Sequence, residues 1–142
     1  MSTLPDWLRS LPRQTLAGAL GIEIVELGDD RVVATMPVDD RTRQPYGLLH
    51  GGASMALAET VASLGAAGRV DRERFAVVGQ EINGNHIRAV KDGIVRAVGT
   101  PVHVGRTSQV WSIEIRDEAE RLVCISRCTL AVIELRGAGA AR

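Results

Sequence analysis

Apolar and polar positions follow different patterns before, within and after the middle of the chain. The central stretch, residues 51–67 (GGASMALAETVASLGAA), is small or apolar on nearly every side, which predicts a helix buried all round. The pattern elsewhere predicts a short helix at residues 14–20, a hairpin of two strands before the central helix, and four long strands after it. The six strands are expected at residues 22–27, 31–38, 75–83, 94–103, 107–117 and 122–135.

This order of elements indicates an α+β architecture in which an antiparallel sheet curls around one central buried helix. Residues 1–142 are expected to form one domain, without internal repeats or linkers. Residues 39–49 (DDRTRQPYGLL) are too polar and turn-rich for a regular element, and read as a loop that delivers residues to the start of the helix. The tail at residues 137–142 (GAGAAR) is expected to fray.

Composition narrows the range of partners. Seventeen acidic residues balance 17 basic ones, which argues against nucleic acid as the main partner. No apolar run is long enough to span a membrane, and Met1 to Leu20 lacks the apolar centre of a signal peptide, so a cytoplasmic location is expected. Cys124 and Cys128 would lie about 13 Å apart on one face of a strand, too far to bridge, as suits core thiols in a reducing compartment.

Glu59 is the only charged side chain between Leu48 and Gly68. An unpaired charge in so apolar a run is costly, and normally finds donors or becomes neutral. Reactivity is one reason to keep a carboxylate there.

Gly51 and Gly52 open the central helix, where the first backbone N–H groups lack intrahelical partners and lie at the positive end of the helix dipole. The Gly51 N–H could therefore stabilise a carbonyl oxygen that becomes an oxyanion, because glycine lets a substrate approach the backbone. Alternatively, the two glycines only let the chain turn tightly into the helix.

The spacing of Gly51 and Glu59 has a consequence for assembly. Eight residues of helix place them about 12 Å apart along the axis, too far to act on one carbonyl. If both act on the same bond, they must come from different chains, with two such helices antiparallel across a twofold axis. The pair therefore predicts a homodimer with shared active sites.

Other side chains near these two could assist. Ser63 is one helical turn after Glu59 and could hold a carboxylate or a water, or bond back to its own i−4 carbonyl. Gln44 and His50 flank the start of the helix and could donate to a carbonyl, although a lone loop histidine can equally be structural. The histidines show no metal-binding spacing, so no metal site is expected. Four basic residues at strand ends and turns are either solvated or bind phosphates such as those of CoA: Arg88, Lys91, Arg96 and Arg106.

The stretch QPYGLLHGGASMALAETVASLGA resembles the signature of hotdog-fold thioesterases, specifically the aromatic acyl-CoA group of the Arthrobacter-type 4-hydroxybenzoyl-CoA thioesterases and 1,4-dihydroxy-2-naphthoyl-CoA hydrolases. The segments VVGQEINGNHIR, PVHVGR and QVWSIEIRDEAERLVCISRCTLAVI are also similar to that group, so the resemblance covers nearly the whole chain. It implies hydrolysis of an acyl-CoA thioester, with CoA as part of the substrate and no further cofactor. It also implies a homotetramer built as a dimer of dimers.

The resemblance implies a role for each matching residue. Glu59 would be the catalytic carboxylate, the Gly51 N–H would polarise the carbonyl with help from Gln44 and His50, and Ser63 would position water. The three groups around the carbonyl, Gln44, His50 and Gly51, would face Glu59 and Ser63 of the neighbouring subunit. CoA contacts would fall on Gly79, His86 and Arg88, and near the turn that holds Arg106, where a small polar residue is usual.

Two other functions share this fold. A hotdog dehydratase or hydratase also pairs a histidine with a helical acid, but GLLHGG with Gln44 upstream fits thioester polarisation better. A non-catalytic acyl-CoA-binding protein would keep Glu59 as a satisfied core residue. For the thioesterase, the sequence leaves open whether Glu59 attacks the carbonyl or deprotonates a water, and which acyl group is bound.

Overall fold

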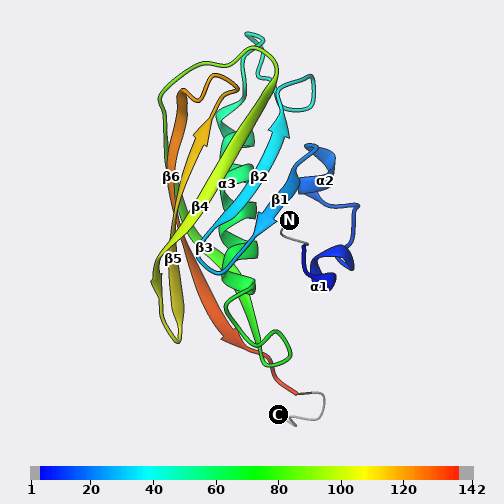
Figure 1. Cartoon of the computed structure of the whole chain (residues 1–142), viewed down its shortest axis with the longest axis vertical. Coiled ribbons are helices and arrows are strands. Elements are labelled where there is room, and N and C mark those ends of the chain that lie inside the picture. The colour runs from blue at the N-terminus through cyan, green and yellow to red at the C-terminus, as the bar shows by residue number, and fades with distance from the viewer. Residues whose placement is uncertain (1–3, 138–142) are drawn as a thin grey trace.

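One long helix lies across a curved antiparallel sheet in the computed structural model, which describes residues 4–137 (Figure 1). The expected C-terminal tail lies outside the described residues except for Gly137. Along this part of the chain the elements are α1 (Asp6–Arg9), α2 (Leu16–Ala19), β1 (Glu23–Leu27), β2 (Val32–Pro37), α3 (Gly51–Ala67), β3 (Phe75–His86), β4 (Ile94–Val104), β5 (Ser108–Arg116) and β6 (Leu122–Glu134). This is the expected α+β architecture, the hotdog fold.

The six strands form one sheet in the order β1-β2-β4-β5-β6-β3, and every neighbouring pair is antiparallel. The chain therefore passes from β2 through α3 to the opposite edge of the sheet, where, within residues 4–137, β3 pairs only with β6. Along β5 the inward positions alternate as period-2 strands require, and are buried: Gln109, Trp111, Ile113 and Ile115.

The sheet-facing side of α3 is the centre of the core. Leu57 and Val61 are fully buried there, and α3 packs against all six strands. Trp111 lies against Gly65 and leaves no room for a side chain there, since a Cβ on Gly65 would come within 2.6 Å of the indole ring. The indole N–H donates to Gln109 Oε1, whose amide donates to the Ala66 carbonyl, so this buried polar group is satisfied.

The prediction that this helix is buried all round is wrong for the single chain. A sheet can cover only the side of a helix that faces it, and the opposite side of α3 is half-buried at Glu59, Thr60, Ser63 and Leu64. Residues of the N-terminal segment 4–20 lie over part of that side, as α2 contacts α3. Arg72, in the loop after α3, stacks 4.1 Å from the Trp7 ring and ties this segment down.

The sequence predicted the long elements better than the short ones. The central helix has the predicted bounds, and the strands agree within one or two residues, except that β3 continues three residues further, to His86. The short helix is only Leu16–Ala19, with Thr15 as its N-cap, and α1 was not predicted. None of the helices in residues 4–137 has the length and apolar character that crossing a membrane requires.

Cys124 and Cys128 are buried on one side of β6 as free thiols, as predicted. Burial raises the pKa of both groups. The pKa of Cys128 rises to about 11, and the negative charges of Glu59 and Glu81 add to the effect of burial.

Candidate active site

The start of α3 is held by His50, which occupies the N-cap position. Its Nδ1 accepts a hydrogen bond from the Gly52 N–H at 2.7 Å, and its own backbone N–H donates to the Thr42 carbonyl at 2.8 Å. Because Nδ1 is an acceptor, the neutral ring carries its proton on Nε2, which is left as a donor. Within residues 4–137 the Gly51 N–H has no hydrogen-bond partner.

The two glycines make room for histidine rings. Neither Gly51 nor Gly52 has a positive φ, so the backbone conformation at these two positions does not itself require glycine. A Cβ on Gly51 would come within 2.6 Å of His86 Nε2, and a Cβ on Gly52 within 2.9 Å of the His50 ring. The space beside the Gly51 Cα, which we expected to be open to substrate, is thus filled by His86 of the same chain.

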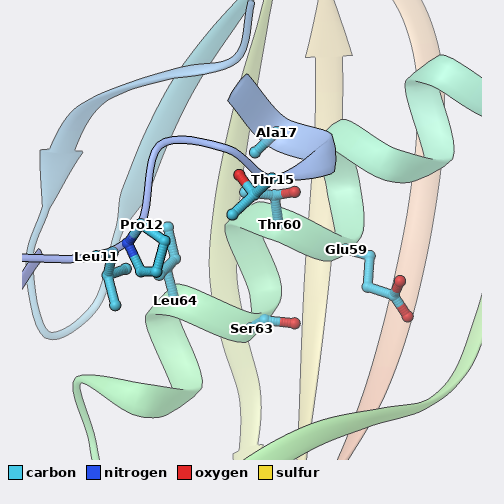
Figure 2. A pocket seen from close by; sticks show the side chains of 8 residues that line it. All are labelled: Leu11, Pro12, Thr15, Ala17, Glu59, Thr60, Ser63 and Leu64. Carbon is cyan, nitrogen blue, oxygen red and sulfur yellow. The ribbon is translucent and has the colours of Figure 1, made fainter. Parts of the chain in front are cut away.

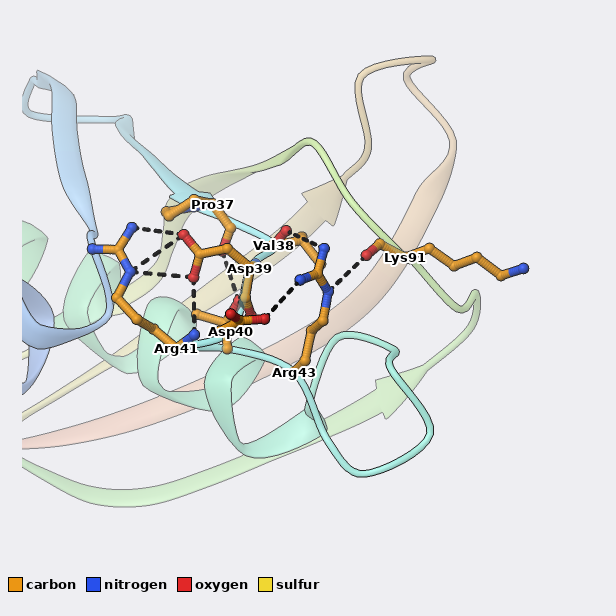
Figure 3. A network of polar contacts seen from close by, with 8 residues as sticks. Pro37, Val38, Asp39, Asp40, Arg41, Arg43 and Lys91 are labelled. Atoms are coloured by element: carbon orange, nitrogen blue, oxygen red, sulfur yellow. Dashed lines mark hydrogen bonds and ion pairs between the residues drawn. The ribbon is translucent and has the colours of Figure 1, made fainter.

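The loop before α3 is fixed by a polar network (Figure 3). Arg43 Nε donates to the Lys91 carbonyl at 3.0 Å, and its terminal nitrogens contact Asp40 and the Val38 carbonyl. Arg41 forms a bidentate ion pair with Asp39, which holds the pKa of that carboxyl below its usual range. The loop at residues 39–49, which we predicted to deliver residues to the helix, is therefore held in place by hydrogen bonds and ion pairs of its own side chains.

Gln44 follows this braced segment and is half-buried. Its backbone N–H donates to the Leu48 carbonyl at 2.8 Å, and its side-chain Oε1 accepts from the Tyr46 N–H. The carbonyl oxygen of the side chain is thus used within the loop. The amide NH₂ remains as a donor, the polarity that orienting a substrate carbonyl requires.

Glu59 and Ser63 lie two turns further along α3, where they line a hollow of about 340 Å³. Figure 2 shows both side chains leaving the helix on the same side, with Leu11 and Pro12 at the other end of the hollow. The lining is mostly apolar and comes from α3 and the N-terminal segment: Leu11, Pro12, Thr15, Ala17, Glu59, Thr60, Ser63 and Leu64. A half-buried carboxylate thus borders an apolar space.

The hydroxyl of Ser63 is not used by the helix. Among the hydrogen bonds of the described residues, the back-bond to an i−4 carbonyl is made by Thr60, whose Oγ1 donates to the Ala56 carbonyl at 2.7 Å. The alternative that Ser63 makes such a bond is therefore wrong. Its hydroxyl points to the same side as the Glu59 carboxylate and is free to hold a water.

One chain keeps the predicted groups in two separate clusters. Gln44, His50 and Gly51 gather at the start of α3, whereas Glu59 and Ser63 lie eight or more residues along the same helix. The rise of a helix puts about 12 Å between Gly51 and Glu59, as the sequence predicted.

Comparison with known proteins decides the family. The family model described as the thioesterase superfamily matches residues 46–124, more than half of the chain. The chain belongs to the thioesterase superfamily.

Individual relatives of this thioesterase extend the match beyond those residues. This chain is 62% identical to ComA2 of Bacillus subtilis over 122 residues, which cover 86% of this chain and 97% of that protein. It is 48% identical to the 1,4-dihydroxy-2-naphthoyl-CoA hydrolase of Escherichia coli over 126 residues, covering 89% and 92%. A crystal structure of a mutant thioesterase from Pseudomonas aeruginosa superposes with a TM-score of 0.89 at 38% identity, covering 95% and 97%. The protein is thus an enzyme that hydrolyses thioesters on a hotdog fold.

The residues expected to contact CoA are not gathered in one place. His86 lies against Gly51, and the exposed Arg88 follows two residues later, beside the start of α3. Arg106 is exposed in the β4–β5 turn at the far end of the sheet, the length of an 11-residue strand from the start of β4. Gly79 lies midway along β3 against Glu59. In one chain, the four residues expected to contact CoA therefore lie in three separate places.

Sequence reasoning missed the N-terminal wall of the hollow. Leu11, Pro12 and Thr15 come from a stretch whose weak pattern predicted only a short helix, and nothing in it signals a contact with residues 45 positions later. In the structure Leu11 is 43% exposed although it lines the hollow.

Proposed function

We propose that this thioesterase hydrolyses acyl-CoA thioesters that carry an aromatic acyl group. The observation that carries the proposal is the position of the Glu59 carboxylate at the border of an apolar hollow, with the free hydroxyl of Ser63 one turn away. A volume of about 340 Å³ suits a small ring system. The hydrolase of Escherichia coli, 48% identical, is named for a naphthoyl-CoA substrate, which supports the same class here.

A second hollow under the N-terminal segment favours a bulky acyl group. It measures about 770 Å³ and shares much of the lining of the first, including Leu11, Thr60 and Leu64. Its apolar side chains include Leu4, Leu8, Ile22 and Ile24, and burial of apolar surface against them would contribute to the affinity. The lining also contains polar and charged side chains, among them Arg9, Arg13, Glu23 and Arg41.

In the proposed reaction, Glu59 of one chain and Gly51 of its partner act on the same carbonyl. The partner's Gly51 N–H stabilises the negative charge that develops on the carbonyl oxygen, while the Gln44 amide and His50 Nε2–H orient it. Glu59 either attacks the carbonyl carbon, expelling CoA as a thiolate and leaving a mixed anhydride that water hydrolyses, or removes a proton from the attacking water. Ser63 holds that water.

Assembly as a homodimer is part of the proposal, because one chain separates its two clusters. The arrangement is supported by β3, an edge strand with many exposed residues and with one side unpaired among the described residues. Pairing such dimers would give a homotetramer. Chromatography with light scattering measures this mass directly, and a monomer with full activity would contradict the shared site.

Thiol release from a panel of thioesters tests the substrate class. Benzoyl-, naphthoyl- and phenylacetyl-CoA are expected to give higher kcat/KM than medium-chain acyl-CoAs. Glu59→Gln, which keeps the shape of the side chain, is expected to lose about 10²- to 10⁴-fold in kcat on every member. Retained activity in Glu59→Gln would overturn the assignment of Glu59, whereas a preference for alkyl chains would overturn only the acyl class.

A single turnover in heavy-oxygen water separates the two routes for Glu59. Label in the Glu59 carboxylate requires the anhydride, because water must then attack the carboxyl carbon of Glu59 and release the acyl group with the original Glu59 oxygen. Label found only in the product acid would show that water attacks the acyl carbon, as it does when Glu59 acts as a base.

A further inference from the structure

Gly79 on β3 lies directly against the Glu59 carboxylate. A Cβ built on Gly79 would come within 2.4 Å of Glu59 Oε1 and 3.1 Å of its Cδ, closer than van der Waals contact allows. The backbone gives no other reason for glycine here, because the φ of Gly79 is not positive. Glycine inside a strand weakens it, and often marks the close approach of another group. In this chain the approaching group is a carboxylate.

The strand is also irregular at this point. Gly79 pairs with Leu130 of β6, but Glu81 pairs with the next residue, Thr129, so Gln80 is an extra residue in β3. Such bulges bend a strand and redirect its side chains, and occur next to active sites. The bulge and the missing side chain together shape the wall that faces Glu59.

We propose that Gly79 is a positioning residue for the thioester hydrolysis, which sets where the Glu59 carboxylate lies. The proposal rests on the proposed role of Glu59. It differs from the expected contact between Gly79 and CoA, because it places the effect on the chemical step and not on the binding of the nucleotide.

Alanine at position 79 would force a specific movement. The backbone of β3 is hydrogen-bonded to β6 and α3 is packed into the core, so the end of the Glu59 side chain must give way. Displacing a reacting group by about 1 Å can cost as much as 10²-fold in rate. Gly79→Ala is therefore expected to lower kcat by about 10- to 100-fold with little change in KM.

Gly84→Ala is a matched control on the same strand. A Cβ on Gly84 would also come within 2.4 Å of a side chain of α3, but that side chain is Met55, whose flexible end can move. Comparing the two variants separates a general cost of alanine in β3 from displacement of the carboxylate. Gly84→Ala is expected to keep kcat within about twofold of the unmodified enzyme, because a flexible methionine adapts without large cost.

The experiment measures kcat, KM and the pH profile of kcat for both variants, on a benzoyl-CoA thioester and on the benzoyl thioester of N-acetylcysteamine, which lacks the nucleotide. Positioning predicts that Gly79→Ala lowers kcat equally on both substrates and shifts the acid limb of the pH profile. A rise in KM confined to the CoA substrate would show a nucleotide contact, and losses equal to those of Gly84→Ala would show a structural effect. Either result overturns the proposal.

A double-mutant cycle with Glu59→Asp completes the test, and applies even if Gly79→Ala folds poorly. Aspartate is one methylene shorter, so it leaves space for the new Cβ. If the two losses were independent, they would multiply. The kcat of the combined variant should be at least threefold above that expected value, or the variant should recover the melting temperature that Gly79→Ala loses. Additive losses contradict the proposal. Full activity in Glu59→Gln, measured in the same assay, would instead refute the role of Glu59.

Discussion

His86 packs its Nε2 edge against Gly51, so closely that a methyl group at position 51 would come within 2.6 Å of the ring nitrogen. A Cβ at position 51 would therefore displace a side chain of the same chain, apart from any contact with substrate. Substitutions of Gly51 consequently disturb packing as well as chemistry. A test of the Gly51 N–H therefore needs two variants that change the packing against His86 in the same way and differ only in the N–H.

Gly51→Pro and Gly51→Ala form such a pair. Both add a Cβ against His86, but only proline removes the N–H, and the first position of a helix accepts proline. His50, the preceding residue, has φ −71 and ψ 128, which is compatible with a following proline. We expect kcat of Gly51→Pro to fall about 10²-fold below that of Gly51→Ala, as for loss of one oxyanion donor. Equal kcat values in the two variants would exclude the N–H from the reaction.

Leu11 tests whether the hollow holds the acyl group. Leu11→Ala removes apolar contact from its wall, so kcat/KM for naphthoyl-CoA should fall about 5- to 20-fold, within the 1–3 kcal/mol that small changes in apolar pockets are worth. Leu16→Ala is the control, because Leu16 is 66% exposed and does not line either hollow. A loss in the control as large as that in Leu11→Ala would place the acyl group elsewhere.

The elements that the sequence predicted well are those with a strong and continuous pattern. The central helix was found to the residue because Gly51 and Gly68 bound a run of small and apolar residues in which Glu59 is the only charged side chain. The strand periodicity located β4 to β6. The spacing of Gly51 and Glu59 gave their separation, because helix geometry depends only on residue number.

What the sequence could not show are contacts between distant segments. The contact of His86 with Gly51, and that of Gly79 with Glu59, depend on how the edge strand crosses α3, and glycine leaves no periodic signal of its partner. The same holds for Leu11 at the hollow. Arg88 and Arg106 are separated because the 11-residue strand β4 runs between them, from one end of the sheet to the other. The positions of the two residues in the sequence do not show this.

The turn between β5 and β6 predicts an acid-sensitive contribution to stability. Asp117 accepts hydrogen bonds from the Arg121 and Ala119 N–H groups at 2.9 and 3.0 Å, and from Arg121 Nε, which lowers its pKa from the ordinary 3.8. A lowered pKa stabilises the folded state above the unfolded value, and this stabilisation is lost as the pH falls below 3.8 toward the folded value.

Thermal unfolding of Asp117→Asn at several pH values checks this. The variant should melt below the unmodified protein at pH 7, and the difference should shrink as the pH approaches 3. Glu118→Gln, the neighbouring carboxylate, should melt like the unmodified protein throughout. A difference for Asp117→Asn that is independent of pH would indicate that the carboxylate charge is not involved.

Complementation between two inactive chains tests the shared site most directly. Gly51→Pro and Glu59→Ala chains are unfolded together in equal amounts, refolded and assayed, with each variant refolded alone as the control. Random pairing makes half of the dimers hybrid, and each hybrid holds one site with an intact Gly51 and an intact Glu59, so about a quarter of the wild-type activity should return. If both residues acted within one chain, no chain in the mixture would be intact and no activity would return.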